Sequence, residues 1–171
     1  MNNVQAIRRC DNTSVGILVF QDEKLLLIDR KKPPFGFAAP AGHVDDHGDP
    51  DDPEEKRYEQ AALDELQEET GLIANELVPW AEGRMENPCR RPGGSWHHWR
   101  IYIATNVTGT LRPSKDETKG HFWCSREQMR YLLRGNPLPI DGREVILEPV
   151  WKDWFLEREV LFLFPSRDIA V

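Results

Sequence analysis

Three glutamates near the middle of the chain have the spacing of a metal-binding group. Glu65, Glu68 and Glu69 belong to a run of good helix formers that ends at Gly71. Each residue of an α-helix advances by about 100°, so the three carboxylates share one side of the predicted helix. Like charges at spacings of three and four repel each other, which favours a divalent cation between them. Mg²⁺ prefers oxygen ligands and is the expected cofactor, with Mn²⁺ as a substitute; the alternative is a solvated acidic face.

The segments around this helix contain clear start, stop and turn signals. Asp52 as N-cap, Pro53 as first helical residue and Glu55 in a capping box predict where the glutamate helix begins. A second helix is predicted over Ser125–Leu133 with Ser125 as its cap, and a last helix over Val145–Leu156. The predicted strands form a hairpin and three further segments: Ser14–Phe20, Lys24–Ile28, Leu72–Trp80, Trp96–Thr105 and His121–Cys124.

Length and composition indicate one globular domain over residues 1–171. Apolar residues make up 39% and charged residues 30% of the chain, and no segment is as long and apolar as a transmembrane helix. The net charge of -7 disfavours a nucleic-acid partner, because phosphate-backbone affinity needs clustered Lys and Arg. Met1–Arg9 lacks the pattern of an export signal, and three widely spaced cysteines suggest free thiols, so we expect a cytoplasmic protein.

The glutamate segment resembles a known family motif. The nine residues Asp64-Glu65-Leu66-Gln67-Glu68-Glu69-Thr70-Gly71-Leu72 are similar to the end of the Nudix box, G-x5-E-x7-R-E-U-x-E-E-x-G-U, where U is bulky and apolar, and eight of the nine positions fit. Gly42 matches the first glycine of the box. The resemblance implies a mixed α/β fold, an α-β-α sandwich around a mixed sheet.

The same resemblance implies which residues bind metal. These are Glu65, Glu68, Glu69, the carbonyl of Gly42, and a loop carboxylate before a Trp-containing strand, for which Glu117 is the choice and Asp116 the reserve. For the loop pair, an exposed turn is an equal alternative.

Two positions depart from the motif. Asp64 stands where the family has Arg, so the usual salt bridge of that arginine is not available. Gly42 lies eight residues further from the glutamates than the pattern allows, and Lys56 occupies the slot of the first glutamate. Glu54, Glu55 and Glu59 are the candidates to replace it, and the sequence does not distinguish them.

The implied reaction is attack of water on one phosphorus of a diphosphate in a small nucleotide-type substrate. Glu65 and Glu117 are both candidates for the general base. His98, Arg100 and Tyr102 alternate onto one face of a strand and could contact phosphate and base, although a half-exposed strand face is as common. The remaining candidates for substrate contacts lie in loops or flank the box: Arg90, Arg91, Arg30 and Phe37.

Rival functions share the fold. A non-catalytic nucleotide sensor would fit the lost Arg and the displaced glutamate. Isomerisation of an isoprenoid diphosphate would need a reactive cysteine, and an RNA-cap hydrolase would need a basic surface. His43, His47, His97 and His98 could suggest a transition metal, but zinc is not expected, because the adjacent His97 and His98 point to opposite strand faces. Oligomeric state is open, with a homodimer among the options.

Overall fold

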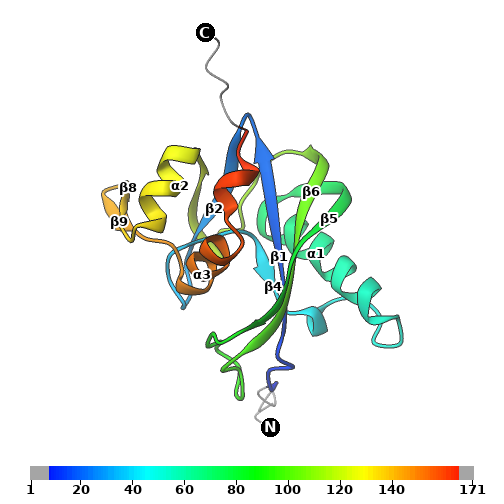
Figure 1. Cartoon of the computed structure of the whole chain (residues 1–171). Helices are drawn as coiled ribbons and strands as arrows, with labels where there is room; N and C mark the ends of the chain where they lie inside the picture. Colours follow the sequence, from blue (N-terminus) through cyan, green and yellow to red (C-terminus); the bar gives the residue numbers. More distant parts are fainter. Residues whose placement is uncertain (1–7, 166–171) are drawn as a thin grey trace.

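A mixed β-sheet forms the centre of the molecule (Figure 1). The computed structural model describes residues 8–165. The strand order is β3-β2-β1-β6-β5, with β4 beside β1 and β7 beside β2. The strands β1 and β6 are parallel and the other neighbours antiparallel. The bounds of the sheet strands are β1 Thr13–Gln21, β2 Lys24–Arg30, β3 Phe37–Ala38, β4 Ala41–Gly42, β5 Leu72–Met85, β6 His97–Gly109 and β7 Thr118–Cys124.

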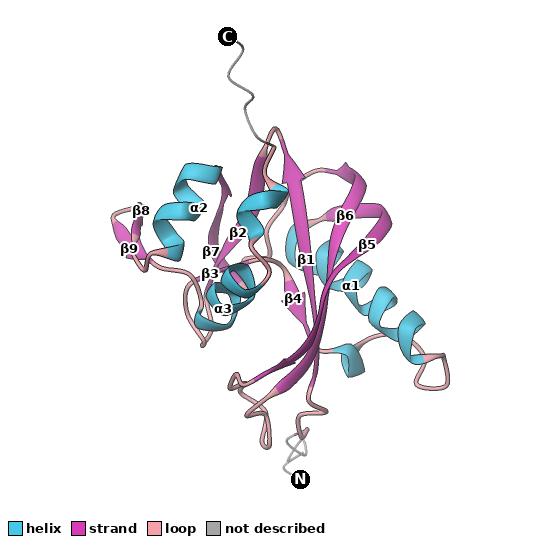
Figure 2. Cartoon of the chain, viewed as in Figure 1, coloured by secondary structure: helices cyan, strands magenta, loops and turns pink. Residues whose placement is uncertain are grey.

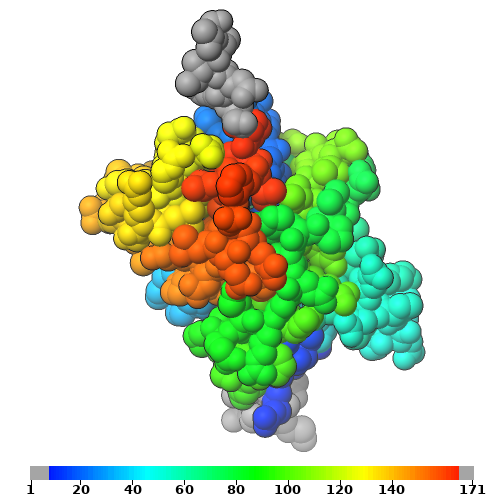
Figure 3. Space-filling model, viewed as in Figure 1, coloured from blue at the N-terminus to red at the C-terminus, as the bar shows by residue number. Residues whose placement is uncertain are grey.

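Helices cover both faces of this sheet (Figure 2). Helix α1, Glu54–Thr70, packs on one face, and α2, Arg126–Leu133, and α3, Pro149–Glu157, pack on the other. Figure 3 shows the C-terminal segment, in orange and red, spread over the middle of the second face. The predicted α-β-α sandwich around a mixed sheet is therefore confirmed.

Alternation along β1 divides the core into two layers. Val15, Ile17 and Val19 are buried against α1, whereas Leu18 belongs to the cluster under α2 and α3. Gly16 also faces that second layer, and a Cβ on it would lie 2.5 Å from the ring of Trp151. The central strand therefore positions both helical layers.

Local signals located most elements correctly. The hairpin of β1 and β2 is confirmed, and its turn residues Asp22 and Glu23 both adopt positive φ angles, 49° and 62°. Helix α1 ends where Gly71 takes the left-handed conformation at φ 74°. Ser125 caps α2 with a complete capping box, in which Gln128 is the partner.

The predicted start of α1 is wrong by one residue. Pro53 is the N-cap, the helix begins at Glu54, and no side-chain cap bond is present there among the described residues. Asp52 instead accepts a hydrogen bond of 2.8 Å from the amine of Lys56. The carboxylate is therefore paired with a cation one turn along the helix rather than with backbone N–H groups.

Long-range pairing changes the bounds of the other elements. Strands β5 and β6 are longer than predicted because they pair along nearly their full lengths, with a bulge between Pro79 and Ala81. The last helix begins at Pro149 instead of Val145, since proline suits the first helical position. Val145 ends a separate hairpin of β8, Leu138–Ile140, and β9, Arg143–Val145.

The expectation about the Met1–Arg9 segment mostly concerns residues that the structure does not describe. Most of the Met1–Arg9 segment and the last six residues lie outside the described residues 8–165. Within that range, none of the helices combines the length and apolar character needed to span a membrane.

Candidate active site

The glutamates of α1 meet the backbone of β4. Ala41 donates its N–H to Oε2 of Glu69 over 2.9 Å, and Glu69 is only 8% exposed. Gly42 lies so close to Glu65 that an added Cβ would be 1.6 Å from Oε1. Only glycine leaves room for this approach. The matching Gly42 of the motif therefore has a physical role, which is to admit the Glu65 carboxylate beside the chain.

Two of the three carboxylates lie close together, and the third lines the same cavity. Carboxylate oxygens of Glu65 and Glu68 and a ring nitrogen of His47 lie within 4.8 Å of one another. Glu65, Glu68 and Glu69 all line one cavity. The helix thus directs the three side chains to a common space.

Electrostatics at Glu69 favour a bound cation. Burial, followed by the negative charge of Glu65, raises the pKa of Glu69 to about 8, and Glu117 acts in the same direction. The Ala41 N–H and Arg30 oppose this rise. A carboxylate that is buried beside other carboxylates is stabilised in its charged form by a divalent ion, and the all-oxygen donor set suits Mg²⁺ or Mn²⁺.

His47 contacts the glutamate site, a position that sequence reasoning did not predict for it. Its Nε2 lies 2.9 Å from Oε1 of Glu65, and its Nδ1 lies 3.3 Å from Oδ2 of Asp64. The hydrogen bond to Glu65 raises the pKa of His47. The imidazole of His47, from the lengthened loop, therefore lies between Glu65 and Asp64, the residue that replaces the arginine of the motif. The only sequence signal was the coincidence of an acidic substitution with an insertion containing histidine.

The displaced first glutamate has no replacement among the proposed candidates. Glu54 binds Arg100 at 2.9 Å, and none of Glu54, Glu55 and Glu59 lines the cavity. Lys56, in the glutamate slot, is an exposed residue paired with Asp52. The carboxylates proposed to bind metal come from the end of α1 and from the loop before β7, and Asp46 and Glu148 also line the cavity.

The cavity beside the glutamates has a volume of about 660 Å³. This is within the range of about 300–1,000 Å³ that holds small ligands. Glu117 and its reserve Asp116 line it, as do the predicted Arg30 and Arg90. Glu117 also pairs with Lys32 at 2.6 Å, and Arg30 pairs with Glu148 at 3.5 Å. Acidic and basic side chains therefore face each other across one space.

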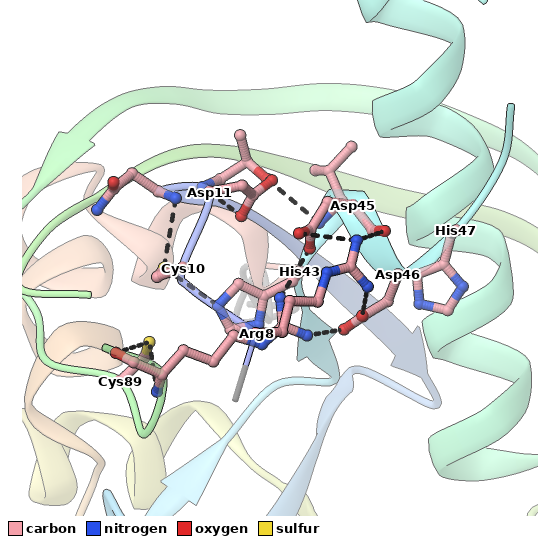
Figure 4. A network of polar contacts seen from close by, with 12 residues as sticks. Arg8, Cys10, Asp11, His43, Asp45, Asp46, His47 and Cys89 are labelled. Atoms are coloured by element: carbon pink, nitrogen blue, oxygen red, sulfur yellow. Dashed lines mark hydrogen bonds and ion pairs between the residues drawn. The ribbon is translucent and has the colours of Figure 1, made fainter. Parts of the chain in front are cut away.

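Arg91 also lines the cavity, but it is already paired. It contacts Asp45 at 2.8 Å and also binds Asp46, in the loop that follows Gly42. Arg8 contacts the same two carboxylates at 3.0 and 2.9 Å (Figure 4). The loop that contains Arg90 and Arg91 is thus fixed against the opening of the motif.

The predicted strand face lies outside this cavity. Arg100 stacks on Tyr58 of α1 at 4.5 Å, and His98 binds Glu82 at 3.0 Å. Tyr102 is buried in the layer under α1. Strand alternation was predicted correctly, but the opposite face of β6, with His97 and Trp99, lines the cavity. The structure therefore does not bring these three side chains to the glutamates.

Phe37 is also outside the cavity. It is 1% exposed in the core under α2 and α3, and its ring lies 4.5 Å from that of Phe122. Strand β3 points this side chain inward, between the sheet and the helices. Phe37 contributes packing at the entry to the motif and does not face the cavity.

Comparison with known proteins agrees with this geometry. The NUDIX domain model matches residues 11–144. The MutT protein from Methanosarcina mazei Go1 is 18% identical with a TM-score of 0.60, covering 91% of this chain and 97% of that one. The NUDIX domain of Shewanella oneidensis NrtR, complexed with ADP ribose, is 17% identical with a TM-score of 0.58, covering 91% and 89%.

A third solved structure is larger. The bifunctional NMN adenylyltransferase/ADP ribose pyrophosphatase from Francisella tularensis, complexed with AMP and Mn ion, is 19% identical with a TM-score of 0.54, covering 91% of this chain and 43% of that one. Among curated proteins, comparison by sequence finds no match. These structures share the fold, and the family model covers most of the sequence with the glutamate helix inside it. The chain belongs to the Nudix family.

Proposed function

We propose that this protein is a Mg²⁺-dependent hydrolase that cleaves the diphosphate bond of a nucleoside diphosphate linked to another moiety. The observation that carries the proposal is the packing of Glu65 and Glu69 against the backbone of Gly42 and Ala41, at the wall of a cavity that also contains arginines. Buried carboxylates and arginines that face one space suit a substrate whose phosphates are bridged by cations.

Each group has a role in the proposed reaction. Glu65, Glu68, Glu69 and Glu117, with the carbonyl of Gly42, would hold Mg²⁺ or Mn²⁺. When bound, the cation neutralises phosphate charge and makes water a better nucleophile. Glu65 or Glu117 would accept the proton from the attacking water.

The cavity arginines would orient the substrate. Arg30, at the end of β2, and Arg90, in the loop between β5 and β6, both line the cavity. Their guanidinium groups suit phosphate oxygens. Arg91, held by Asp45 at 2.8 Å, would fix the loop more than it would bind phosphate. These roles are consistent with solved neighbours that bind ADP ribose in one case and AMP with Mn ion in another. A cytoplasmic location and a homodimer remain predictions from the sequence.

A hydrolysis screen tests the proposal. Purified protein with Mg²⁺ is incubated with ADP ribose, dinucleotides, nucleotide sugars and nucleoside triphosphates, and the products are identified by mass. Glu68→Gln and Glu69→Gln should each lower turnover by orders of magnitude while the circular dichroism spectrum stays unchanged. Glu59→Gln, an exposed glutamate of the same helix, is the matched control and should keep full activity.

Two outcomes would contradict the proposal. Normal turnover in both variants would remove the site assignment, and turnover in excess chelator would remove the metal requirement. Tight binding of a nucleotide without turnover of any member of the panel would favour the non-catalytic sensor instead.

A further inference from the structure

Four metal-ligating side chains from three separate segments meet beside the cavity, and three of them line it. One precedes β1, one follows β4, and two come from the β5–β6 loop and the start of β6. One ligand atom from each lies within 4.8 Å of all the others. Figure 4 shows three of them close together beside Arg8. We define the Cys2His2 cluster as Cys10, His43, Cys89 and His97.

The spacing inside the cluster fits a tetrahedral ion. The Sγ atom of Cys10 lies 3.5 Å from Nε2 of His43 and 3.2 Å from Nε2 of His97. A tetrahedral Zn²⁺ with Zn–S near 2.3 Å and Zn–N near 2.05 Å separates sulfur from nitrogen by about 3.5 Å. Two thiols and two imidazoles form a donor set for which Zn²⁺ is the expected metal.

Backbone amides support both sulfur atoms in the same way. The N–H of Asn12 points at Sγ of Cys10 over 3.3 Å, and the N–H of Arg91 points at Sγ of Cys89 over 3.3 Å. In each case the donor is two residues after the cysteine. N–H groups directed at sulfur are outer-shell hydrogen bonds of the kind that orient metal ligands. The two cysteines therefore have matching backbone surroundings, in addition to the short distances between the four ligand atoms.

The loop that contains Cys89 is shaped around the sulfur atoms. A Cβ on Gly94 would lie 2.1 Å from Sγ of Cys89 and 3.1 Å from Sγ of Cys10. The N–H of Cys89 donates to the carbonyl of Gly94 over 2.8 Å, and the N–H of Cys10 donates to the carbonyl of Pro92 over 3.0 Å. The backbone therefore closes around the two thiols and leaves no space for a side chain at Gly94.

We propose that the Cys2His2 cluster binds one structural Zn²⁺ ion. Four protein ligands complete a tetrahedral shell, which is the arrangement of a structural site and not of a catalytic one. His43 directly follows Gly42, and Cys89 directly precedes Arg90. The ion would therefore join the glycine that admits Glu65 to the loop that presents the cavity arginine. The proposal does not depend on the hydrolase assignment.

The sequence alone did not lead us to expect zinc. The adjacent His97 and His98 do point to opposite faces, as alternation requires, and only His97 is in the cluster. Its partners come from distant parts of the chain, with Cys10 and Cys89 separated by β1, α1 and β5. No short spacing motif could therefore reveal the four ligands.

Metal analysis of the full chain tests the proposal. Protein purified in reductant from zinc-supplemented medium should contain about one zinc per chain by mass spectrometry of the metal. After removal of zinc, Co²⁺ should bind and produce the visible absorption of a tetrahedral cobalt–thiolate site. Added Mg²⁺ should not displace it, which distinguishes this site from the glutamate site.

Variants of the cluster sharpen the test. Cys10→Ser and Cys89→Ser should lose the zinc and the cobalt spectrum, and Gly94→Ala should do the same without removing a ligand. The controls are Cys124→Ala, which removes the buried thiol outside the cluster, and Gly120→Ala, where an added Cβ makes only an ordinary contact at 4.0 Å. Both controls should retain one zinc.

The proposal fails if folded wild-type protein contains no zinc and shows no cobalt spectrum. It also fails if thiol titration without reductant finds a Cys10–Cys89 disulfide in place of the metal, or if Gly94→Ala retains full zinc. If a serine variant does not fold, wild-type stoichiometry and the Gly94→Ala variant still decide the question.

Discussion

Replacing Gly42 by alanine should displace the carboxylate of Glu65 from its position beside β4. The new Cβ would lie 1.6 Å from Oε1 and 2.0 Å from Cδ of Glu65. Non-bonded carbon and oxygen atoms approach to about 3.3 Å, so the carboxylate oxygen must move by about 1.7 Å. The displaced atoms are the end of a flexible side chain, so the fold should survive.

We expect the Gly42→Ala substitution to lower the catalytic rate. A misplacement of about 1 Å in a reacting constellation can lower turnover about 100-fold, which corresponds to about 2.7 kcal/mol in the activation free energy. Gly42→Ala should therefore reduce kcat by about 100-fold or more. The thermal midpoint should change little, because only the end of the Glu65 side chain is displaced.

Kinetics with the best substrate of the hydrolysis screen measure this effect. Initial rates are recorded over a Mg²⁺ titration for wild type, Gly42→Ala and Gly120→Ala. The last variant adds the same methyl group where the nearest atom is 4.0 Å away. Wild-type kcat in Gly42→Ala would show that Glu65 can move without cost, and an equal loss in Gly120→Ala would show that the effect is not local.

Two further predictions concern stability. Burial raises the pKa of Glu148 from 4.5 to about 7, against the opposing charge of Arg30. The folded form thus keeps a proton that the unfolded chain releases near pH 4.5, so the free energy of unfolding should fall as pH rises through this window. Glu148→Gln should flatten that dependence and raise the unfolding free energy near pH 8 by about 1 to 3 kcal/mol in urea titrations; an unchanged slope would contradict the pKa argument. Ser125→Ala removes the capping box of α2 and should cost about 1 kcal/mol in the same assay, whereas a gain in stability would disprove the capping role.

Local chemistry in the sequence predicts much of this fold. Gly71 ends α1 because left-handed backbone suits glycine, and Ser125 starts α2 because its hydroxyl accepts a backbone N–H. The clustering of the three glutamates follows from helical periodicity alone. Each of these features depends on residues within a few positions of one another.

Features that depend on distant segments could not be predicted in the same way. Alternation identified the two faces of β6, but which face borders the cavity depends on where α1 packs. His47 reaches Glu65 only because a lengthened loop folds back on the helix. The Cys2His2 cluster needs the pairing of β1 with β6 to bring Cys10 beside His97.

The central strand β1 is paired along both edges, with β6 on one side and with β4 and then β2 on the other. Val15 is opposite Gly42 in one ladder and opposite Arg100 in the other. Backbone held on both sides opens only when neighbouring strands separate. Gly42 and Ala41, which contact the glutamates of α1, therefore pair with a strand that is held along both edges, and the proposed metal site shares that support.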